Sequence, residues 1–577
     1  MSTAAPQGLW TLGLGGSDHD SSAALMLDRD IQVAIEQERI TRRKHGVSHF
    51  FENPVACAVE YCLDTCGITL NDVSRAVSSD LLPQKVRSEL LFRDIQLYPH
   101  HLCHAASACM LLPPKSTAAV LVYDGMGSIR GRTNDQPVRN IRETFSFYLL
   151  NRDGLRLLGQ TTGTGIFEHD DFPSSVNNSL GMLYELITAV LGFGVLESGK
   201  TMGLAAYGRP VHEELIEEFI TYGSEPGACF ECRVDDPALR TTIEGILRAQ
   251  RGSFEVKANL AASIQAIVNK TLVHCVGMFA GHTFQYICIV GGCALNTVAN
   301  SYLVDHSPFD VPVVVPPHAG DAGLALGALW LSARGAAEPL TIRGSPLHPK
   351  IARPGRTYTH ADVAAAAASF YPHVYVDTSI ATAHDIAREL NRGSVIGFFS
   401  GGSEIGPRAL GGRSILASPR IAATRERINR ELKFREPFRP LAPIIPAERF
   451  GDFFTDVRHA DPFMLKVAYA NDRCRRESPA VVHVDGSARA QVVSKDSEPL
   501  LHAIATALGE IEGTPIVLNT SFNRRGEPIV ETPLDAFDAF VNMKLDGLFI
   551  EGAFYRRSPR ASDVEDRGAS VDRVFDR

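Results

Sequence analysis

The sequence predicts an α/β protein with more than one domain. Its 577 residues exceed what a single hydrophobic core usually organises. Short apolar stretches typical of strands recur along the chain, and stretches with apolar residues at helical spacing lie between them. The order around residue 290 is an example, with a helix at 259–280, a strand at 286–290, a Gly-Gly turn and another helix. Such alternation indicates sheets that are covered by helices.

The composition excludes several classes of protein. Hydrophobic residues make up 45% and charged residues 21%, which is ordinary for a soluble globular chain. A formal net charge of -9 argues against a broad nucleic-acid-binding surface, although it permits a local basic pocket. The chain shows neither a secretory signal nor an apolar run of membrane-spanning length. Its eleven cysteines form no disulfide pattern, so we expect a cytoplasmic protein. From the charge and the lack of a membrane-length apolar run, we expect neither nucleic-acid nor membrane partners.

The chain opens with a strand, a glycine-rich loop and a hairpin. The strand covers 10–14, the loop 15–20, and the hairpin strands 22–27 and 32–36. Actin, Hsp70 and sugar kinases use such an opening to approach phosphate, but a glycine-rich loop alone is a weak signal. The basic cluster at 38–46 either holds an anion or is a solvated surface.

Two histidines one helical turn apart form the first candidate site. If their segment is helical, His100 and His104 share one face and can bind one divalent metal. Asp124 ends the apolar strand 119–123, and Asp321 lies in a glycine-flanked turn after another apolar run, so both are candidate ligands. The alternative is that the histidines are surface or helix-cap residues, which the spacing alone does not exclude.

Two glycine-rich stretches invite comparison with nucleotide-binding loops. Gly199–Lys200–Thr201 resembles part of a phosphate-binding loop, but the predicted helix 181–191 precedes it where a strand is required, so we reject that interpretation. Gly291–Asn296 follows a strand and precedes a helix, an order that brings backbone amides to a nucleotide. A simple tight turn is the alternative there.

Beyond a Pro- and Gly-rich passage, a second domain carries cations in loops that glycine and proline fix. These cations are Arg408, Lys433, Arg439 and Arg489. In a net-acidic chain, cations embedded in this way indicate one phosphate-rich ligand, whereas each alone is more often a surface charge. We expect domains at 8–345 and 360–555, a linker at 346–359 and a charged tail at 556–577.

With these features, the chain resembles the O-carbamoyltransferase family that includes nodulation protein NodU and the cephem and tobramycin carbamoyltransferases. The resemblance runs from residue 10 to residue 555. It rests on seven motifs in the family's order, Ser17–Leu25, Glu38–Gly46, His100–Ser107, Gly199–Ala206, Gly406–Gly411, Arg439–Pro443 and Leu518–Asn523.

The resemblance implies an N-terminal Kae1-like domain of the actin/Hsp70 (ASKHA) superfold and a C-terminal YrdC-like α/β domain. In the YrdC-like domain, carbamoyl phosphate would lose phosphate and its carbamoyl group would be adenylated by ATP with Mg²⁺. In the Kae1-like domain, a hydroxyl of a small-molecule natural product would accept the carbamoyl group from carbamoyl-adenylate, and AMP would leave. One protein suits both steps, because this intermediate hydrolyses readily in water. A homodimer is compatible with the family.

The resemblance also assigns roles to residues of the first domain. His19 would take the proton of the acceptor hydroxyl or orient the carbamoyl group, and the residues alone do not separate these roles. Lys44 would hold phosphate or polarise the carbonyl. The ligands of an iron-type (Fe²⁺ or other divalent) metal with Lewis-acid function would be His100, His104, Asp124 and Asp321.

The nucleotide and carbamoyl phosphate would be held by residues of both domains. The adenosine contacts implied by the resemblance are Gly291, Gly292 and Asn296. Those to carbamoyl phosphate and the triphosphate of ATP are Arg408, Lys433, Arg439, Arg489, Asn519 and Ser521.

Two other interpretations use the same folds. A tRNA-modifying enzyme that forms threonylcarbamoyl-adenylate would need a tRNA surface, of which the acidic balance gives no sign. A nucleotide-binding scaffold would have lost the chemistry, and the complete set of candidate catalytic and metal-binding residues argues against it. The acceptor molecule stays open, because the segments that would shape its pocket, 128–180 and 209–256, carry no readable pattern.

Overall fold

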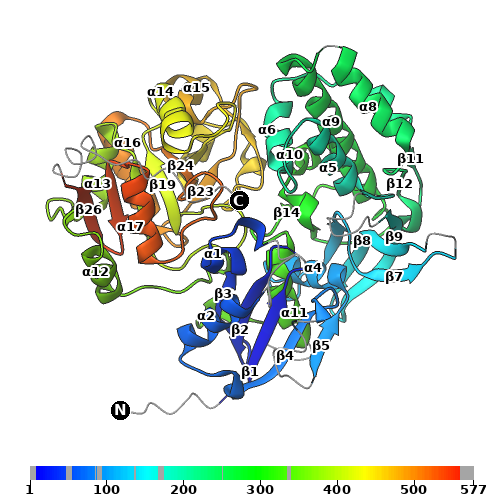
Figure 1. Ribbon diagram of the computed structural model, residues 1–577, viewed down its shortest axis with the longest axis horizontal. Helices are drawn as coiled ribbons and strands as arrows, with labels where there is room; N and C mark the ends of the chain where they lie inside the picture. Colours follow the sequence, from blue (N-terminus) through cyan, green and yellow to red (C-terminus); the bar gives the residue numbers. More distant parts are fainter. Residues whose placement is uncertain are drawn as a thin grey trace, which may run out of the picture.

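The computed structural model describes residues 8–17, 19–46, 55–84, 86, 94–134, 138–166, 175–249, 251–333 and 339–558, and it is mixed α/β as predicted (Figure 1). Two seven-stranded sheets use strands between Trp10 and Pro346, and one eight-stranded sheet uses strands between Val374 and Arg557. All eleven cysteines are unpaired. Within the described ranges, no helix combines the length and apolar character needed to cross a membrane. The domain limits stay a prediction, and most of the predicted tail lies outside the described residues.

The first sheet is organised around β1 (Trp10–Gly15). β1 pairs antiparallel with β2 and parallel with β4, and β2 pairs antiparallel with β3, which confirms the predicted opening hairpin. The strand order is β16 (Ser345–Pro346), β15 (Thr341–Ile342), β3 (Asp30–Glu36), β2 (Ser22–Leu27), β1, β4 (Val73–Ser79) and β5 (Ile95–Tyr98).

The second sheet repeats this topology around β6 (Ala118–Tyr123). β6 pairs antiparallel with β8 and parallel with β13, β8 pairs antiparallel with β9, and β13 pairs parallel with β14. The strand order is β10 (Ser175–Val176), β9 (Gly154–Ile166), β8 (Asn140–Asn151), β6, β13 (Tyr286–Val290) and β14 (Val313–Val314), with β7 (Ile129–Arg132) beside β8. The long β8–β9 hairpin lies where the sequence offered no readable pattern.

Two helices lie between these sheets. α4 (His100–Cys109) packs on β6 and β13, α11 (Leu324–Ser332) packs on β1 and β4, and the helices contact each other (Figure 1). Their contact requires glycine at position 327, because a Cβ there would lie 1.9 Å from the carbonyl oxygen of Cys103. This close approach fixes α4 relative to α11 in the centre of the N-terminal half.

Further helices gather beyond the second sheet, at the upper right of Figure 1. They are α5 (Leu180–Val190), α6 (Ser198–Ala205), α7 (Glu213–Glu217), α8 (Pro237–Ala249), α9 (Phe254–Gly277) and α10 (Thr297–His306), with the two-stranded sheet β11 (Ile220–Tyr222) and β12 (Phe230–Cys232). The helix predicted at 259–280 begins earlier, because Ser253 caps it by accepting a hydrogen bond from the Val256 N–H at 3.4 Å. The predicted helix 181–191 precedes Gly199–Lys200 as α5, in agreement with the rejection of a P-loop.

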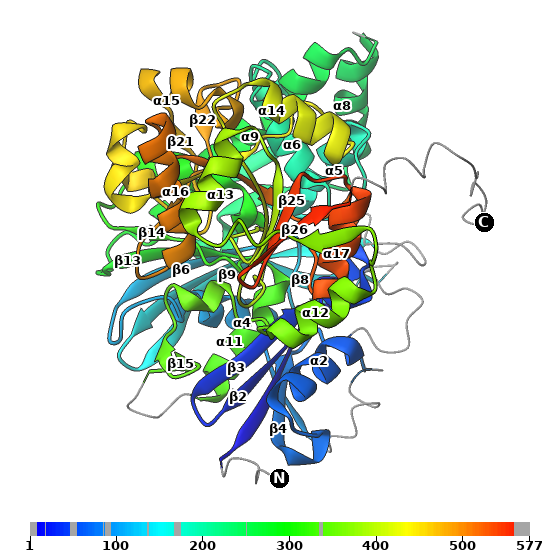
Figure 2. The same cartoon turned by 90° about the vertical axis from the view of Figure 1, so that its left-hand side faces the viewer.

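The third sheet carries helices on both faces. Figure 2 shows α13 (Ala383–Asn391) and α16 (Pro499–Glu512) on one side of it and α17 (Pro533–Asn542) on the other. Successive residues therefore enter opposite cores, with Phe398 packing beside α13 and α16 and Phe399 beside α12 (His360–Ala368) and α17. The strand order is β17 (Val374–Val376), β26 (Ala553–Arg557), β25 (Gly547–Ile550), β18 (Ile396–Phe399), β19 (Arg413–Ala417), β24 (Val517–Ser521), β20 (Ala442–Pro446) and β23 (Gln491–Val493).

One element of this half departs from the sequence prediction. The helix expected at 423–432 is α-helical only over α14 (Ala423–Glu426) and continues as a π-helix over Arg427–Leu432. Such π-helical turns are rare and occur often at functional sites. α15 (Asp472–Glu477) and the two-stranded sheet β21 (Ala468–Tyr469) and β22 (Ser487–Ala488) lie in the same half.

Buried polar contacts join the two halves. Glu36, at the end of β3, accepts a hydrogen bond from the Gly406 N–H at 2.9 Å, and Arg39 in α1 (Gln37–Thr41) donates to the Gly406 carbonyl at 2.6 Å. Arg39 also donates to Glu36 at 2.7 Å, and its side chain is fully buried. Both polar groups of the Gly406 backbone are therefore held by one ion pair of the other half.

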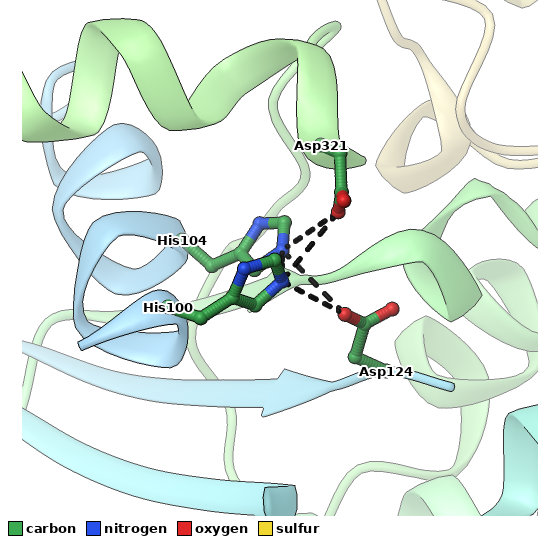
Figure 3. Close-up of side chains that lie close together, drawn as sticks. All are labelled: His100, His104, Asp124 and Asp321. Atoms are coloured by element: carbon green, nitrogen blue, oxygen red, sulfur yellow. Dashed lines mark hydrogen bonds and ion pairs between the residues drawn. The ribbon is translucent and has the colours of Figure 1, made fainter. Parts of the chain in front are cut away.

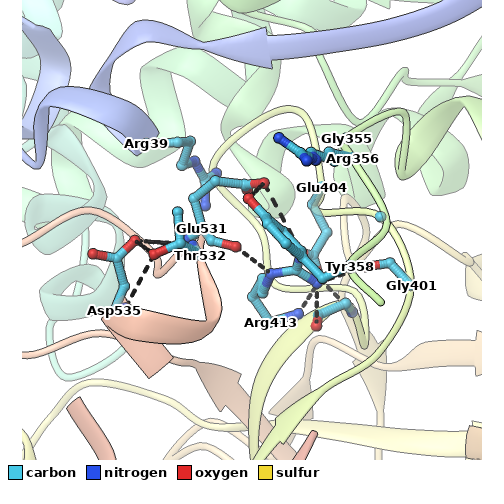
Figure 4. Close-up of polar contacts among 12 residues, drawn as sticks. Arg39, Gly355, Arg356, Tyr358, Gly401, Glu404, Arg413, Glu531, Thr532 and Asp535 are labelled. Atoms are coloured by element: carbon cyan, nitrogen blue, oxygen red, sulfur yellow. Dashed lines mark hydrogen bonds and ion pairs between the residues drawn. The ribbon is translucent and has the colours of Figure 1, made fainter. Parts of the chain in front are cut away.

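A second set of buried polar residues lies beside Arg39, and Figure 4 shows its contacts around Arg413 and Glu531. Arg413 donates to the Gly401 carbonyl at 2.8 Å and to the Glu531 carbonyl at 3.3 Å. The Glu531 carboxylate accepts from the Tyr61 hydroxyl of α2 (Ala56–Cys66) at 2.5 Å. Because Tyr61 belongs to the first half, this contact also crosses the interface.

We expect the Arg39→Ala variant to lose about 3–5 kcal/mol of unfolding free energy, since removal of one partner leaves Glu36 as an unpaired buried charge. Urea unfolding measures this change. Arg240→Ala is the matched control, because Arg240 forms an exposed ion pair with Glu244 and such pairs contribute little. Equal midpoints for the two variants would contradict a stabilising role for the buried pair.

Candidate active site: a metal-ligand set and a cation cluster

The first turn and a half of α4 carries the predicted histidine pair. α4 begins at His100, so His100 and His104 lie one turn apart on the same helix face. Their rings are 1% and 0% exposed, which overturns the alternative that they are surface residues. Their Nε2 atoms are 3.1 Å apart.

Two aspartates from distant segments complete this group, as Figure 3 shows. Asp124 follows the last residue of β6, and Asp321 begins the short helix that leads into α11. His100 Nε2 lies 3.3 Å from Asp124 Oδ2 and 3.6 Å from Asp321 Oδ1. His104 Nε2 lies 3.7 Å and 3.4 Å from the same two oxygens. We call these four residues the metal-ligand set.

The geometry of the metal-ligand set fits one divalent ion. Its four ligand atoms all lie within 4.8 Å of one another. Atoms bound at about 2.1 Å to a common ion are separated by about 3.0–3.5 Å, close to the separations found here. Two imidazoles with two carboxylates suit iron, zinc or manganese.

The remaining carboxylate oxygens of the set are held by neighbouring donors. The Gly292 N–H donates to Asp124 Oδ1 at 3.0 Å, and the Ser17 hydroxyl donates to Asp321 Oδ2 at 3.2 Å. Burial lowers the pKa of His100, but Asp321 and Asp124 outweigh burial and raise it to about 10. Carboxylates oriented in this way present one oxygen each to the two rings.

His19 lies within electrostatic reach of this set. Its Nδ1 is 3.0 Å from Asp20 Oδ2, and Asp20 also contacts His45 Nδ1 at 3.1 Å. Burial lowers the pKa of His19, but Asp20, followed by Asp321 and Asp124, raises it to about 9. Asp18, in the same motif, lies outside the described residues.

Lys44 lies on the side of the other half. It begins a short helix, Lys44–Gly46, and its side chain is exposed. Burial and Arg435 are the main causes that lower the pKa of Lys433, and Lys44 adds to them. Lys44 therefore lies within electrostatic range of Lys433 in the C-terminal half.

The loop Gly291–Asn296 packs against the strand that leads to Asp124. Gly291 has φ +101°, and a Cβ there would lie 2.3 Å from the carbonyl oxygen of Tyr123, so glycine is required. Asn296 caps α10 by accepting a hydrogen bond from the Ala299 N–H at 3.1 Å. Asn296 therefore has a structural role in the free protein.

The cations predicted in the C-terminal half form one cluster. Burial, together with Arg489 and Arg439, lowers the pKa of Arg408 well below its usual value. Burial and Arg439 lower the pKa of Arg489 to about 10, and burial followed by Arg439 and Arg489 lowers that of Arg435 to about 9. Arg439 also lowers the pKa of Lys433, so its charge acts on every other member. We call these five residues the cation cluster.

Carboxylates contribute little to the cation cluster. Among the described residues, its one ion pair is long, with 3.9 Å between Arg439 Nη1 and Glu436 Oε2. Lys433 instead donates to neutral acceptors, the Ser521 carbonyl at 2.6 Å, the Ser521 hydroxyl at 2.9 Å and Asn523 Oδ1 at 2.9 Å. Lys433 is buried and the other four cations are half-buried. Shielded cations with so few acidic partners favour an anionic ligand.

The structure places Asn519 in a supporting position and adds residues that the sequence analysis missed. Asn519 donates to the Ala409 carbonyl and to Gln491 Oε1, both at 2.9 Å. Asn429, in the π-helix, accepts from Arg435 Nε at 2.8 Å and donates to the Arg439 carbonyl at 2.9 Å. Arg435 was detectable, because it stands two residues after Lys433, whereas Asn429 had no signal in the sequence.

One loop joins the two groups of residues. Arg408 donates to the Leu295 carbonyl at 3.4 Å, and Gly292 in the same loop donates to Asp124. The metal-ligand set and the cation cluster therefore lie on either side of Gly291–Asn296. Each half of the chain contributes one of them.

The chain is similar to known carbamoyltransferases over most of its length. Residues 81–330 match the family described as carbamoyltransferase N-terminus, and residues 387–557 match carbamoyltransferase C-terminus. Nodulation protein NolNO of Sinorhizobium fredii is 30% identical over 94% of this chain and 80% of its own. Nodulation protein NolO of Bradyrhizobium diazoefficiens is 34% identical over 70% of this chain and 73% of its own.

Other similarities are less informative about activity. An uncharacterized protein of Synechocystis is 30% identical over 96% of this chain and 98% of its own. The solved structure of full-length HypF in a phosphate- and nucleotide-bound form aligns with 57% of this chain and 56% of its own, at 14% identity and a TM-score of 0.39. A likeness of that size does not identify the fold.

Proposed function

The chain belongs to the carbamoyltransferase family, and we propose that it transfers the carbamoyl group in two steps through carbamoyl-adenylate. In the first, carbamoyl phosphate, ATP and water give carbamoyl-adenylate, pyrophosphate and phosphate. In the second, a hydroxyl of a small-molecule natural product takes the carbamoyl group, and AMP and a proton leave. The observation that carries this proposal is the meeting of the metal-ligand set and the cation cluster across the loop Gly291–Asn296.

The first step is assigned to the cation cluster in a YrdC-like C-terminal domain. Carbamoyl phosphate and the triphosphate of ATP are anions, and the cluster is a half-buried group of cations with few acidic neighbours. Its guanidinium groups would align the two substrates and neutralise the charge that develops on the leaving pyrophosphate, with Mg²⁺ bound to ATP. Asn519 would hold the loop that carries Arg408 through the Ala409 carbonyl, and Ser521 would hold Lys433 by accepting its hydrogen bond.

The second step is assigned to the metal-ligand set in a Kae1-like N-terminal domain. The repeated strand order of the first two sheets supports an actin/Hsp70-type architecture with its ligand between two equivalent halves. A metal bound by this set supplies Lewis-acid chemistry at the phosphate of the adenylate. His19 would take the hydroxyl proton or orient the carbamoyl group, and Lys44 would compensate phosphate charge from the side of the cation cluster.

Adenosine is assigned to the surface beside Asp124, where Gly291–Asn296 packs against the start of α5. A hollow between α5 and α8 is lined by Met182, Leu186 and Leu247, and Glu185 lies on its wall. Ser179, the residue before α5, connects this helix to the metal-ligand set, because its hydroxyl donates to the Asp124 carbonyl at 3.3 Å and to the neighbouring Gly125 carbonyl at 2.6 Å. Apolar side chains next to a carboxylate suit a base and its ribose hydroxyls.

Mass spectrometry of an acceptor-free reaction tests the proposal. With ATP, carbamoyl phosphate and Mg²⁺, the wild type should form carbamoyl-adenylate or its breakdown product AMP. If the wild type forms an adenylate only when threonine and bicarbonate replace carbamoyl phosphate, and that product is threonylcarbamoyl-adenylate, the tRNA-modifying alternative is supported instead. If neither set of substrates gives an adenylate or AMP, the adenylate mechanism is wrong.

His19→Ala is expected to form carbamoyl-adenylate at the wild-type rate, because His19 lies near the metal-ligand set and not in the cation cluster. Transfer to an acceptor should fall about 10²–10⁴-fold, the usual contribution of a general acid or base. Rapid-quench analysis of AMP and product separates the two steps. A His19→Ala variant that fails to form the adenylate would contradict the assignment of the steps to two sites.

A further inference from the structure

A fully buried carboxylate lies behind the histidines of the metal-ligand set. Glu143 is on β8 and is 0% exposed. Four donors converge on its two oxygens. Oε2 accepts from the Ser128 N–H at 3.1 Å and from the His101 N–H at 3.4 Å. Oε1 accepts from Gln160 Nε2 at 2.7 Å and from an Arg130 guanidinium nitrogen.

These contacts hold the beginning of α4. The residue before α4, Pro99, provides no side-chain cap, so the first N–H groups of the helix need other acceptors. Ser128 supplies one, since its hydroxyl accepts from the His100 N–H at 2.8 Å and donates to Asp80 Oδ1 at 2.7 Å. Glu143 supplies the next, at His101. The helix end that carries both metal-ligand histidines is therefore capped from β8 and from the residue before β7.

The four donors make a carboxylate necessary at this position. An ionised carboxylate only accepts hydrogen bonds, whereas an amide turns an NH₂ group toward two of the neighbouring donors. A buried charge is costly unless it is paired and fully hydrogen-bonded, and Glu143 meets both conditions through Arg130 and the other three donors.

We propose that Glu143 is a positioning residue for the metal centre, acting through the first turn of α4. Together with Ser128 it fixes the rotation of the helix, so that both Nε2 atoms face Asp124 and Asp321. Glu143 would increase the affinity for a divalent metal without contacting the ion. This inference rests on the metal centre in the proposed function.

Titration of the metal-free full-length chain with Co²⁺ tests the role of Glu143. Loss of partners that orient metal ligands typically weakens binding 10–100-fold, and we expect a decrease of that size for Glu143→Gln. The visible d–d absorption of bound Co²⁺ should also shift, because the ligand geometry relaxes. A role in stability alone would lower the melting temperature without changing this spectrum.

Two matched controls isolate the effect. Glu404→Gln alters another buried carboxylate, which accepts three backbone N–H groups at 2.6–3.1 Å in the C-terminal half, and should leave Co²⁺ affinity at the wild-type value. Ser128→Ala carries the test if Glu143→Gln does not fold. Its control is Ser263→Ala, because Ser263 also accepts a backbone N–H, at 3.0 Å, and donates to a carbonyl, at 2.8 Å.

The outcomes distinguish this inference from its premise. If wild type shows no Co²⁺ binding that His104→Ala removes, the proposed metal centre is wrong, and the role of Glu143 fails with it. If wild type binds Co²⁺ at this site and both Glu143→Gln and Ser128→Ala keep its affinity and spectrum, only the positioning role is overturned. Weaker binding and a shifted spectrum in both variants support it.

Discussion

Arg439→Ala is expected to decrease carbamoyl-adenylate formation by roughly 10²–10³-fold, the effect typical of removing one preorganised donor from a charge-stabilising site. The measurement is the initial rate of AMP and carbamoyl-adenylate production from ATP, carbamoyl phosphate and Mg²⁺ without an acceptor. The variant should fold normally, because removing Arg439 relieves repulsion among the cations around it.

Arg439 lies within electrostatic range of every other member of the cation cluster. Burial is the main cause that lowers the pKa of the other four members of the cation cluster, and the charge of Arg439 adds to this effect at each of them. Its own carboxylate neighbour, Glu436, is distant at 3.9 Å, which leaves the guanidinium group available for phosphate. An arginine in this position would contribute more to the transition state than one at the edge of the cluster.

Arg449→Ala is the control for this experiment. Arg449 pairs with Asp452 at 2.6 Å on the surface of the same half. We expect a wild-type rate for this variant. Retention of more than about a tenth of the rate by Arg439→Ala would argue that the cation cluster is not the adenylation site, since a preorganised charge should contribute far more.

His104→Ala is expected to lose the metal and with it the transfer step. Its imidazole is one of four ligands, and its removal leaves two aspartates facing one histidine. Affinity should fall by more than about 100-fold, since partners outside the coordination shell already contribute 10–100-fold. Plasma mass spectrometry of the dialysed protein measures metal content, and extensive chelation of wild type should have the same consequence.

The adenylation rate of the same preparation is the internal comparison. Because the cation cluster is formed by the other half of the chain, His104→Ala should make carbamoyl-adenylate normally. His306→Ala, which alters an exposed histidine in α10, should keep both metal and activity. A metal content unchanged by His104→Ala would show that the ion binds elsewhere.

Much of this site could be predicted from local sequence. The spacing of His100 and His104, with Asp124 after an apolar strand and Asp321 in a glycine-flanked turn, made these four residues candidate metal ligands, and the family resemblance favoured that interpretation over surface histidines. Local spacing is informative here because a helix places residues i and i+4 on one face, and a strand end fixes a side chain at the edge of a sheet. The hairpin β2–β3 and the strands β6, β13 and β18 were readable for the same reason.

Other features had no local signal. Glu143 and Ser128 lie in a stretch without a readable pattern, and their role follows only from the packing of β8 against α4. The burial of the two histidines and the hydrogen bond from Arg408 to Leu295 also depend on tertiary structure. The same is true of the hydrogen bonds that Arg39 and Glu36 form with the backbone of Gly406.

The sequence by itself determined the type of fold, the family and the candidate ligands, because strand and helix periodicity and short motifs are encoded locally. The tertiary structure alone decided how the two candidate sites are arranged. It brought segments separated by more than 100 residues to the two sides of one loop, as in the contact of Arg408 with Leu295. Such contacts depend on the packing of whole sheets and helices, and no short segment of the chain encodes them.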